Sequence, residues 1–384
     1  MRRLLATVAL VCVGAAMPGP AAATPPDAVP SPEISAAGAV LWDPDDDRIL
    51  FGIEPDAPRP MASTTKIMTI LLALEGGTLG DTVTVSAAAA ARGEATLNLV
   101  AGQTVPMESL VGGLILASGN DASIAVAEHV AGDEVAFVDM MNTRAADLGL
   151  DATHFLNPSG LTNDPAHHAS PLDLARLADV AMGHEVFARY AGMQTATLPG
   201  IGRLTNRNEL LSSYPHATGV KTGYMSAAGN TLVASATQEG RTLYAVVLGS
   251  ADRAADAQAL LEYGFAAFRR AEPVGAGTAA AIYRTSSGQV PAVLTERLAR
   301  TVNVDQQVTW RTRMTPGVHG PIGEGQELGT MELLVDGEVT GSSPLVAGED
   351  HHPDPARTDA QRVGDAVQDA LRGITRTAVI ERAD

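Results

Sequence analysis

The chain has 384 residues, a formal net charge of −18 and a single cysteine, Cys12. This length allows two domains with sizeable cores, and an apolar content of 45% is ordinary for a globular protein. The negative charge argues against nucleic acid or an anionic membrane surface as the main partner, because both repel an acidic protein.

The first 23 residues have the pattern of a secretory signal peptide. Arg2 and Arg3 precede an apolar run, residues 4–17, and a stretch of Pro, Gly and Ala follows it. The run is shorter than the ~20 residues that a bilayer-spanning helix needs, which argues against a membrane anchor. Cys12 lies inside this segment, so we expect an exported, extracytoplasmic protein without disulfides, a thiol nucleophile or a cysteine-based zinc site.

The segment that follows predicts a lead, a hairpin and a helix. Residues 24–35 are rich in Pro and Ala and predict a flexible lead. Two short apolar runs, residues 36–42 and 48–53, predict a β-hairpin. We expect the Asp-rich turn between them to be solvated. Three prolines then bring the chain in extended form to residues 67–74, which are almost wholly apolar and predict a buried helix.

Ser63 and Lys66 stand at the start of this helix. Residues three apart share a helix face, so this spacing holds a hydroxyl beside an amine at the positive end of a buried helix. A serine becomes a strong nucleophile when a base takes its proton, and a lysine is a base once desolvation or a nearby positive charge favours its neutral form. The alternative is that Ser63 only caps the helix and Lys66 is solvated, because this spacing often arises by chance.

The remaining elements of the first two thirds come in blocks: strands, helices, strands and a final helix. This order predicts an α+β fold, a three-layer domain over residues 36–271 with an antiparallel sheet, helices on both of its faces and an α-rich subdomain. The patterns predict helices at 107–117, 122–130, 134–148, 172–182, 185–190 and 254–269, and strands at 219–223, 230–237 and 242–249.

The composition changes after residue 272. Gly and Pro punctuate short β-type runs, such as 302–308 and 332–335, which predicts a small β-rich domain over residues 272–346. Residues 347–384 form a polar tail in which a helix over 357–376 would have a thin apolar stripe. This helix is either a membrane-surface anchor or an exposed marginal helix, and its mixed Asp and Arg face without Trp or Phe favours the second.

Two tripeptides join the Ser63 and Lys66 pair in a set of three motifs. Ser118-Gly119-Asn120 lies at a predicted helix end, where side chains can project into a cleft. Lys221-Thr222-Gly223 lies on a predicted strand, where the small glycine leaves room for a substrate backbone along the strand edge. In this order, each on the element type that it needs, they form the motif set of penicillin-binding proteins and class A β-lactamases.

The chain therefore resembles the D-alanyl-D-alanine carboxypeptidases, the low-molecular-weight penicillin-binding proteins of bacterial cell walls. The likeness covers residues 33–270, including the segments 114–122, 137–142, 153–161 and 219–224. One departure is the stretch 168–173, where the family usually has His-x-Thr-Ala-x-Asp and this chain has His-Ala-Ser-Pro-Leu-Asp. The resemblance implies a β-lactamase/transpeptidase-like fold, with residues 272–346 as the second domain that many members carry.

The resemblance implies a peptidoglycan stem peptide ending in D-Ala-D-Ala as substrate, β-lactams as covalent inhibitors and no cofactor. Ser63 would attack the penultimate carbonyl to form an acyl-enzyme, with Lys66 as the base that takes its proton. Ser118 would relay a proton to the leaving amine, and Asn120 would bind the substrate amide and hold Lys66.

The same resemblance assigns the substrate-binding groups. Lys221 would supply positive charge that keeps the base neutral, and would hold the terminal carboxylate together with the Thr222 hydroxyl. The backbone N–H groups of Ser63 and Tyr224 would form the oxyanion hole. Arg253 either grips the substrate carboxylate bidentately or is a surface arginine at a helix N-terminus.

Other sites and functions have weaker support. His167-His168 and His351-His352 have no third ligand at a convincing spacing, so we expect loop residues and not a metal site. A β-lactamase is disfavoured, because no Glu-x-x-Leu-Asn stretch lies between the second and third motifs. The intact motifs argue against a silent wall-binding scaffold, whereas a DD-endopeptidase acting on peptidoglycan crosslinks would use the same residues and stays open.

Overall fold

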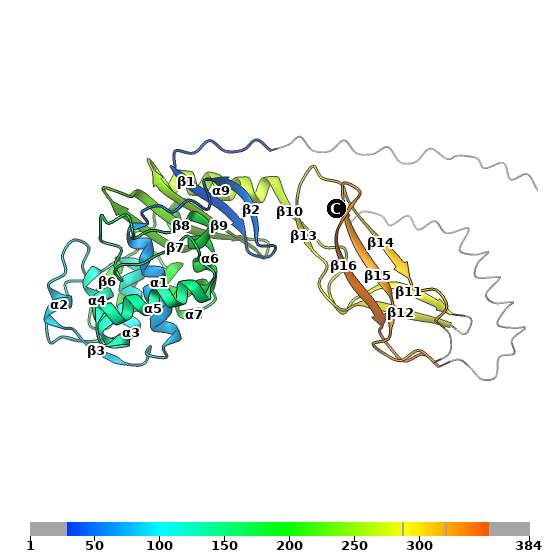
Figure 1. The fold of residues 1–384 in the computed structure, drawn as a ribbon, viewed down its shortest axis with the longest axis horizontal. Coiled ribbons are helices and arrows are strands. Elements are labelled where there is room, and N and C mark those ends of the chain that lie inside the picture. The colour runs from blue at the N-terminus through cyan, green and yellow to red at the C-terminus, as the bar shows by residue number, and fades with distance from the viewer. Residues whose placement is uncertain (1–28, 286–287, 319–320, 353–384) are drawn as a thin grey trace, which may run out of the picture.

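The computed structural model describes residues 29–285, 288–318 and 321–352, which form two lobes joined end to end (Figure 1). The predicted signal peptide and the helix predicted at 357–376 lie outside the described residues. The first lobe combines a sheet with helices and the second is β-rich, so the predicted α+β architecture is confirmed. No helix in the described ranges is long and apolar enough to cross a membrane.

An antiparallel sheet of five strands, in the order β2-β1-β9-β8-β7, runs through the first lobe. The predicted hairpin forms one side of it, with β1 Gly38–Asp43 paired with β2 Arg48–Ile53. The strands predicted after the helical block are β7 Ala217–Met225, β8 Gly229–Gln238 and β9 Arg241–Ser250. Because β1 also pairs with β9, the beginning and the end of the lobe's sequence close one sheet.

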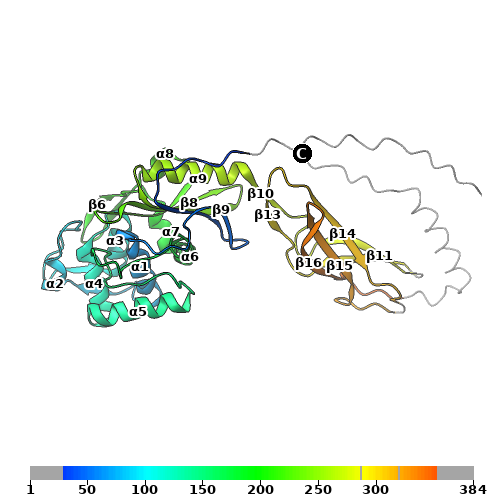
Figure 2. The same ribbon diagram turned by 45° about the horizontal axis from the view of Figure 1, so that its top comes forward.

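Helices cover both faces of this sheet (Figures 1 and 2). Alternate strand residues point to opposite faces, so Leu41 packs beneath α9, whereas its neighbour Val40 packs against the helical block. The α9 side carries α9 Arg253–Ala267 and the short α8 Leu210–Ser213. The opposite side carries α1 Lys66–Glu75, α3 Met107–Leu116, α4 Asn120–Ala131, α5 Glu134–Asp147, α6 Pro171–Met182 and α7 Glu185–Ala191.

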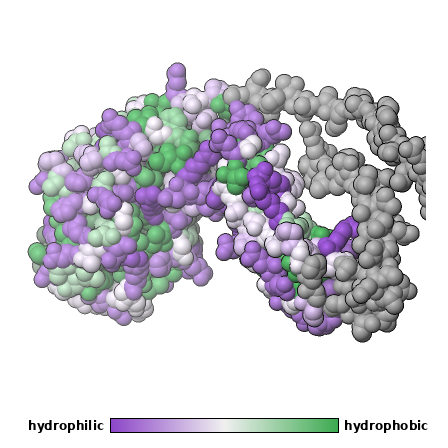
Figure 3. Space-filling model, turned by 45° about the vertical axis from the view of Figure 1, so that its right-hand side comes forward, coloured by the Kyte–Doolittle hydropathy of each residue, from purple (hydrophilic) through white to green (hydrophobic). Residues whose placement is uncertain are grey.

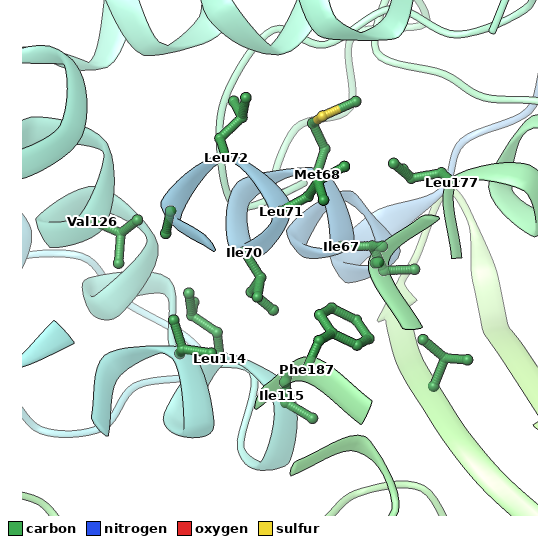
Figure 4. Packing of buried hydrophobic residues seen from close by; sticks show 14 of the residues in the cluster. Ile67, Met68, Ile70, Leu71, Leu72, Leu114, Ile115, Val126, Leu177 and Phe187 are labelled. Atoms are coloured by element: carbon green, nitrogen blue, oxygen red, sulfur yellow. The ribbon is translucent and has the colours of Figure 1, made fainter. Parts of the chain in front are cut away.

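The helix α1 lies at the centre of the larger core. Its side chains from Ile67 to Ala73 are buried, as the unbroken apolar run predicts. They share one buried cluster with residues of α3, α4, α6 and α7, and Figure 4 shows Leu114 of α3 and Phe187 of α7 facing α1. A helix packed on all sides is a rigid support, so the residues at its N-terminus have fixed positions.

Short elements fill the rest of the first lobe. A 3₁₀ turn, η1 Ala62–Thr65, precedes α1, and β3 Thr82–Thr84 pairs with β4 Thr104–Pro106. Some short elements were not predicted from the sequence: α2 Ala87–Ala90, α8 and the hairpin of β5 Thr195–Leu198 with β6 Gly202–Thr205. Each of these has only four residues, which is too short for a periodic pattern to be recognised.

The second lobe is a sheet of five strands in the order β11-β12-β16-β15-β14, with its own small core. The strand predicted at 302–308 is wrong, because residues 304–307 form a turn in which the Gln306 N–H donates to the Asn303 carbonyl. The strand β10 pairs with β13, so it belongs with this lobe although the prediction placed it in the first domain. The strands are β10 Phe268–Ala271, β11 Ala279–Thr285, β12 Gly288–Leu294, β13 Arg300–Asn303, β14 Val308–Met314, β15 Glu327–Val335 and β16 Glu338–Ala347.

Charged and polar side chains join the two lobes. The carboxylate of Asp46 accepts a hydrogen bond of 2.8 Å from Arg270 Nη1, and Asp43 accepts one of 2.7 Å from the Thr301 hydroxyl. Asp43 is fully buried and also accepts from Arg241 at 2.8 Å. The Asp-rich turn, which the sequence predicted as solvated, is therefore the polar connector between the lobes.

The described part of the predicted flexible lead, residues 29–35, is packed against the first lobe. Val29 and Ile34 contact the core beneath α9, and the Ser35 hydroxyl donates to the Asp256 carboxylate at 2.7 Å. The prediction missed this contact because its partner lies 221 residues away in the sequence.

On the face shown in Figure 3, the coloured hydrophobic and hydrophilic residues of the first lobe are interspersed.

Candidate active site

Ser63 lies within η1, which runs directly into α1. The N-cap of this turn is Met61, whose side chain makes no capping bond, so the alternative that Ser63 only caps the helix is wrong. The Ser63 Oγ instead lies 3.0 Å from Lys66 Nζ. The packed helix thus holds hydroxyl and amine within hydrogen-bonding distance.

Lys66 is fully buried and is not the solvated side chain of the alternative interpretation. Besides Ser63, its Nζ contacts Asn120 Oδ1 at 2.8 Å and the Ser159 carbonyl at 2.6 Å. Burial, followed by the positive charge of Arg207, lowers the pKa of Lys66 to about 7. Near neutral pH, a substantial fraction of this amine is therefore unprotonated and able to accept a proton.

The loop that carries the Ser159 carbonyl passes very close to the turn η1. Gly160 in this loop has a φ of +80°, and a Cβ there would lie 1.9 Å from the Ala62 carbonyl oxygen. Only glycine fits this conformation and this separation, so the loop can bring its carbonyl to Lys66.

His167 ties the same loop to η1. Its Nδ1 accepts from the Leu156 N–H at 2.9 Å, so the ring proton lies on Nε2, which donates to the Thr65 hydroxyl at 2.8 Å. Thr65 in turn donates to the Ala62 carbonyl at 2.8 Å. Burial lowers the pKa of His167 to about 4, so the ring is neutral near pH 7. His167 is a buried structural histidine and not a metal ligand.

Ser118 and Asn120 come from the junction of α3 and α4. Ser118 has a φ of +62°, is buried, and its hydroxyl has no hydrogen-bond partner among the described residues. Asn120 accepts from Lys66 and donates through Nδ2 to the Gly93 carbonyl at 3.1 Å. The asparagine thus orients the amine, and the serine hydroxyl remains available to a bound molecule.

The third motif lies on β7, beside Ser63. Lys221 is buried and donates to the Thr222 carbonyl at 2.8 Å. Burial, followed by the charge of Lys66, lowers the pKa of Lys221 well below its usual range. We expected Lys221 to keep Lys66 neutral, but Arg207 is the cation that acts on Lys66 in this way. A Cβ at Gly223 would lie 2.9 Å from the Ser63 nitrogen, so the glycine lets the backbone of Ser63 approach β7 closely.

A cavity of about 250 Å³ opens above these groups. The exposed ring of Tyr224 and the half-buried Arg253 stand at its edge. Arg253 donates to the Gly223 carbonyl at 3.1 Å and to both carboxylate oxygens of Glu209, at 3.0 and 3.1 Å. Of the predicted site residues, the cavity is lined by Ser63, Ser118, Asn120, Thr222, Gly223, Tyr224 and Arg253, with Lys66 and Lys221 buried nearby.

Comparisons with known proteins agree with this geometry. A family model described as D-alanyl-D-alanine carboxypeptidase matches residues 24–252. The chain belongs to the D-alanyl-D-alanine carboxypeptidase family. A second model, the C-terminal domain of penicillin-binding protein 5, matches residues 268–353. The match of each model to one lobe supports the boundary near β10.

Relatives of known name cover most of this carboxypeptidase. It is 33% identical to the D-alanyl-D-alanine carboxypeptidase DacF of Bacillus subtilis, over 91% of this chain and 95% of that protein. Penicillin-binding protein 6B of Escherichia coli has 31% identity and a TM-score of 0.69, covering 84% of this chain and 98% of that one. Penicillin-binding protein 5 of Haemophilus influenzae has 30% identity and a TM-score of 0.68, covering 84% and 99%. The protein is thus a serine-type D-alanyl-D-alanine carboxypeptidase.

Three groups of the carboxypeptidase's site were not predicted from the sequence. They are Arg207, which lowers the pKa of both lysines, Glu209, which binds Arg253, and the carbonyl of Ser159. The stretch 206–208 has an arginine between two asparagines, which marks a turn but no function. Within the described ranges, no group of three or more His, Cys, Asp or Glu side chains is placed to hold a metal ion.

Proposed function

We propose that Ser63 is the nucleophile of this carboxypeptidase and that Lys66 is its base. Ser63 Oγ attacks the carbonyl carbon of the penultimate residue in a peptide ending in D-Ala-D-Ala, and Lys66 Nζ takes the hydroxyl proton. The observation that carries this proposal is the 3.0 Å contact between a serine hydroxyl and a buried lysine whose pKa is about 7. Asn120 and the Ser159 carbonyl orient the neutral amine by accepting its two protons.

Ser118 serves as the proton relay to the leaving group. When the peptide C–N bond breaks, the departing D-Ala nitrogen needs a proton, and Lys66 carries the one taken from Ser63. Ser118 supports this role because its buried hydroxyl lines the cavity and has no hydrogen-bond partner among the described residues. A hydroxyl can accept from the ammonium and donate to the amine in the same step.

The tetrahedral intermediate is stabilised by the backbone N–H groups of Ser63 and Tyr224. Gly223 of β7 supports this assignment, because its missing Cβ lets the strand and the backbone of Ser63 approach closely. One preorganised donor of this kind contributes about 3 kcal/mol to barrier lowering in comparable acyl-transfer sites.

The terminal carboxylate of the substrate binds where Thr222, Lys221 and Arg253 come together. Arg253 offers a fork of donors suited to a carboxylate, and it already binds one, that of Glu209. Substrate binding then replaces the Glu209 carboxylate on Arg253 by the substrate carboxylate.

The acyl-enzyme forms with peptides and with β-lactams. Water, deprotonated by Lys66, attacks the acyl carbonyl, and the C–Oγ bond breaks as Ser63 recovers its proton. A β-lactam has no leaving group that departs, so its ring-opened acyl group stays attached until water removes it. The N-terminal pattern of residues 1–23 supports export, which would bring the enzyme to the cell wall.

Intact-protein mass spectrometry with benzylpenicillin tests the proposal. The parent should gain the mass of one drug molecule, and Ser63→Ala should gain none. An adduct on the alanine variant would place the nucleophile elsewhere, whereas rapid destruction of the drug without an adduct would indicate a β-lactamase. Release of D-Ala from an acetylated Lys-D-Ala-D-Ala peptide measures the peptidase reaction itself.

A further inference from the structure

A second cavity adjoins the catalytic one. Its volume is about 460 Å³, and it shares Glu94, Leu161, Tyr224 and Met225 with the cavity above Ser63. The proposed mechanism leaves this second cavity without an occupant. Its further lining residues are Thr162, Asn163 and Ser226.

The direction of β7 indicates what reaches this second cavity. If the substrate carboxylate lies at Thr222 and the reacting carbonyl at Tyr224, the peptide runs antiparallel to β7. Its preceding residue then lies beyond Met225, at about 3.3 Å of chain per residue. Met225 and Ser226 line the second cavity, so the residue third from the substrate's C-terminus enters it.

Glu94 is the only charged side chain among the residues that line the second cavity. The other charged side chains that line the two cavities are the cations Arg207 and Arg253. Glu94 is exposed, and within the described part of the chain it makes no hydrogen bond and no salt bridge. Its carboxylate is therefore free to pair with a ligand.

The backbone on both sides of Glu94 is fixed. Asn120 donates through Nδ2 to the Gly93 carbonyl at 3.1 Å and through its backbone N–H to the Ala95 carbonyl at 2.7 Å. Glu94 itself has a φ of +65°, a conformation that is uncommon for a residue with a side chain. The same asparagine that orients Lys66 thus fixes the backbone that carries the Glu94 side chain, which lines both cavities.

We propose that Glu94 selects substrates with a positively charged side chain on the residue third from the C-terminus. This proposal rests on the proposed carboxypeptidase reaction. The substrate is then recognised at two opposite charges, its carboxylate at Arg253 and a side-chain ammonium at Glu94. Glu94 thereby distinguishes a third residue whose side-chain amine is free from one whose amine is acylated.

The test compares two peptides that differ in one charge. Nα-acetyl-L-Lys-D-Ala-D-Ala keeps the side-chain ammonium, and Nα,Nε-diacetyl-L-Lys-D-Ala-D-Ala lacks it. The parent should have the larger kcat/KM for the charged peptide, and Glu94→Gln should lower the ratio of the two values about fivefold, equivalent to ~1 kcal/mol. The ratio cancels any effect of Glu94 on the pKa of Lys66, because both peptides react through the same base.

Glu239→Gln is the matched control. Glu239 is also an exposed glutamate with positive φ, at +52°, but it lies in the turn at the far end of β8. That turn is about 30 Å along the strand from the end of β8 that is nearest the site. This variant should keep the parent's ratio.

The outcomes separate the two proposals. If the parent releases D-Ala from neither peptide, the proposed function fails. If it cleaves both, and the ratio is the same in the parent and in Glu94→Gln, the role of Glu94 is overturned while the function stands. If the ratio of the two kcat/KM values falls equally in Glu239→Gln, the effect is one of general charge, and the role of Glu94 is also overturned.

Discussion

The floor and the rim of the site hold their charged groups in opposite surroundings. The floor comprises Ser63, Lys66, Ser118, Asn120 and Lys221, which belong to packed elements or their junctions. The rim comprises Glu94, Arg207, Glu209, Tyr224 and Arg253, which border solvent. On the floor, burial moves the pKa of a lysine far enough to make it a base. On the rim, water screens each charge, so a carboxylate or guanidinium can recognise a substrate but contributes little free energy. Burial thus separates chemistry from recognition.

The largest expected effect is on the floor, at Lys66→Arg. Arginine keeps the positive charge but does not lose its proton in a protein, so it cannot act as a base. We expect the rate of acylation by benzylpenicillin to fall about 10³-fold, within the range that one general base contributes. Circular dichroism would establish that the variant is folded. A rate within about tenfold of the parent's would show that another group takes the Ser63 proton.

A smaller but still large loss is expected at Gly223→Ala. The new Cβ would lie 2.9 Å from the Ser63 nitrogen and 2.5 Å from the Thr231 hydroxyl, which forces β7 away from the nucleophile. Displacement of one oxyanion donor should lower the acylation rate about 10²-fold. Gly80→Ala is the control, since a Cβ there meets no atom within 4 Å. Equal acylation rates for the two variants would show that acylation does not depend on the close approach of Gly223 to Ser63.

The charges of the rim should shift the pKa of Lys66 on the floor. The acylation rate of the parent should rise with pH through about 7, because Lys66 accepts a proton only once its own ammonium has lost one. Arg207 lowers the pKa of Lys66 and Glu94 raises it, so Arg207→Gln should move the midpoint to higher pH and Glu94→Gln to lower pH. Acylation rates between pH 5 and 10 measure these midpoints. Shifts in the same direction, or none, would refute this coupling.

The smallest effect is expected within the rim, at Glu209→Gln. Loss of the carboxylate leaves Arg253 without its competing partner, so KM for a D-Ala-D-Ala peptide should fall about twofold. The difference should shrink as salt is added, because screening weakens the exposed pair. A higher KM would instead show that Glu209 positions Arg253 for the substrate.

The sequence predicted most of the floor and little of the rim. The buried helix and the three motifs are local patterns, so the sequence alone indicated Ser63, Lys66, Asn120 and Lys221. Arg207 and Glu209 act across long sequence separations, since Glu209 binds a residue 44 positions away. No spacing along the chain marks such a pair, and a single arginine in a turn is more often a surface residue.

The fold follows the same division. Elements of six or more residues in the first lobe were predicted within a few positions, because their buried apolar residues recur at a regular spacing. The packed lead at Ser35 and the lobe junction at Asp43 were not predicted, because both depend on partners more than 190 residues away.

The neutral ring of His167 makes the stability of the folded enzyme sensitive to acid. Its pKa is about 4 in the folded protein and near 6.5 in an unfolded chain, so the unfolded state binds more protons between these values. The free energy of unfolding therefore falls as the pH drops from 6.5 to 4, by up to about 3 kcal/mol. A protonated ring can no longer accept from the Leu156 N–H, so the loop that presents Ser159 to Lys66 should loosen first. Exposure to acid would then release the base from its orienting carbonyl before the lobe unfolds, and a return to neutral pH would restore it.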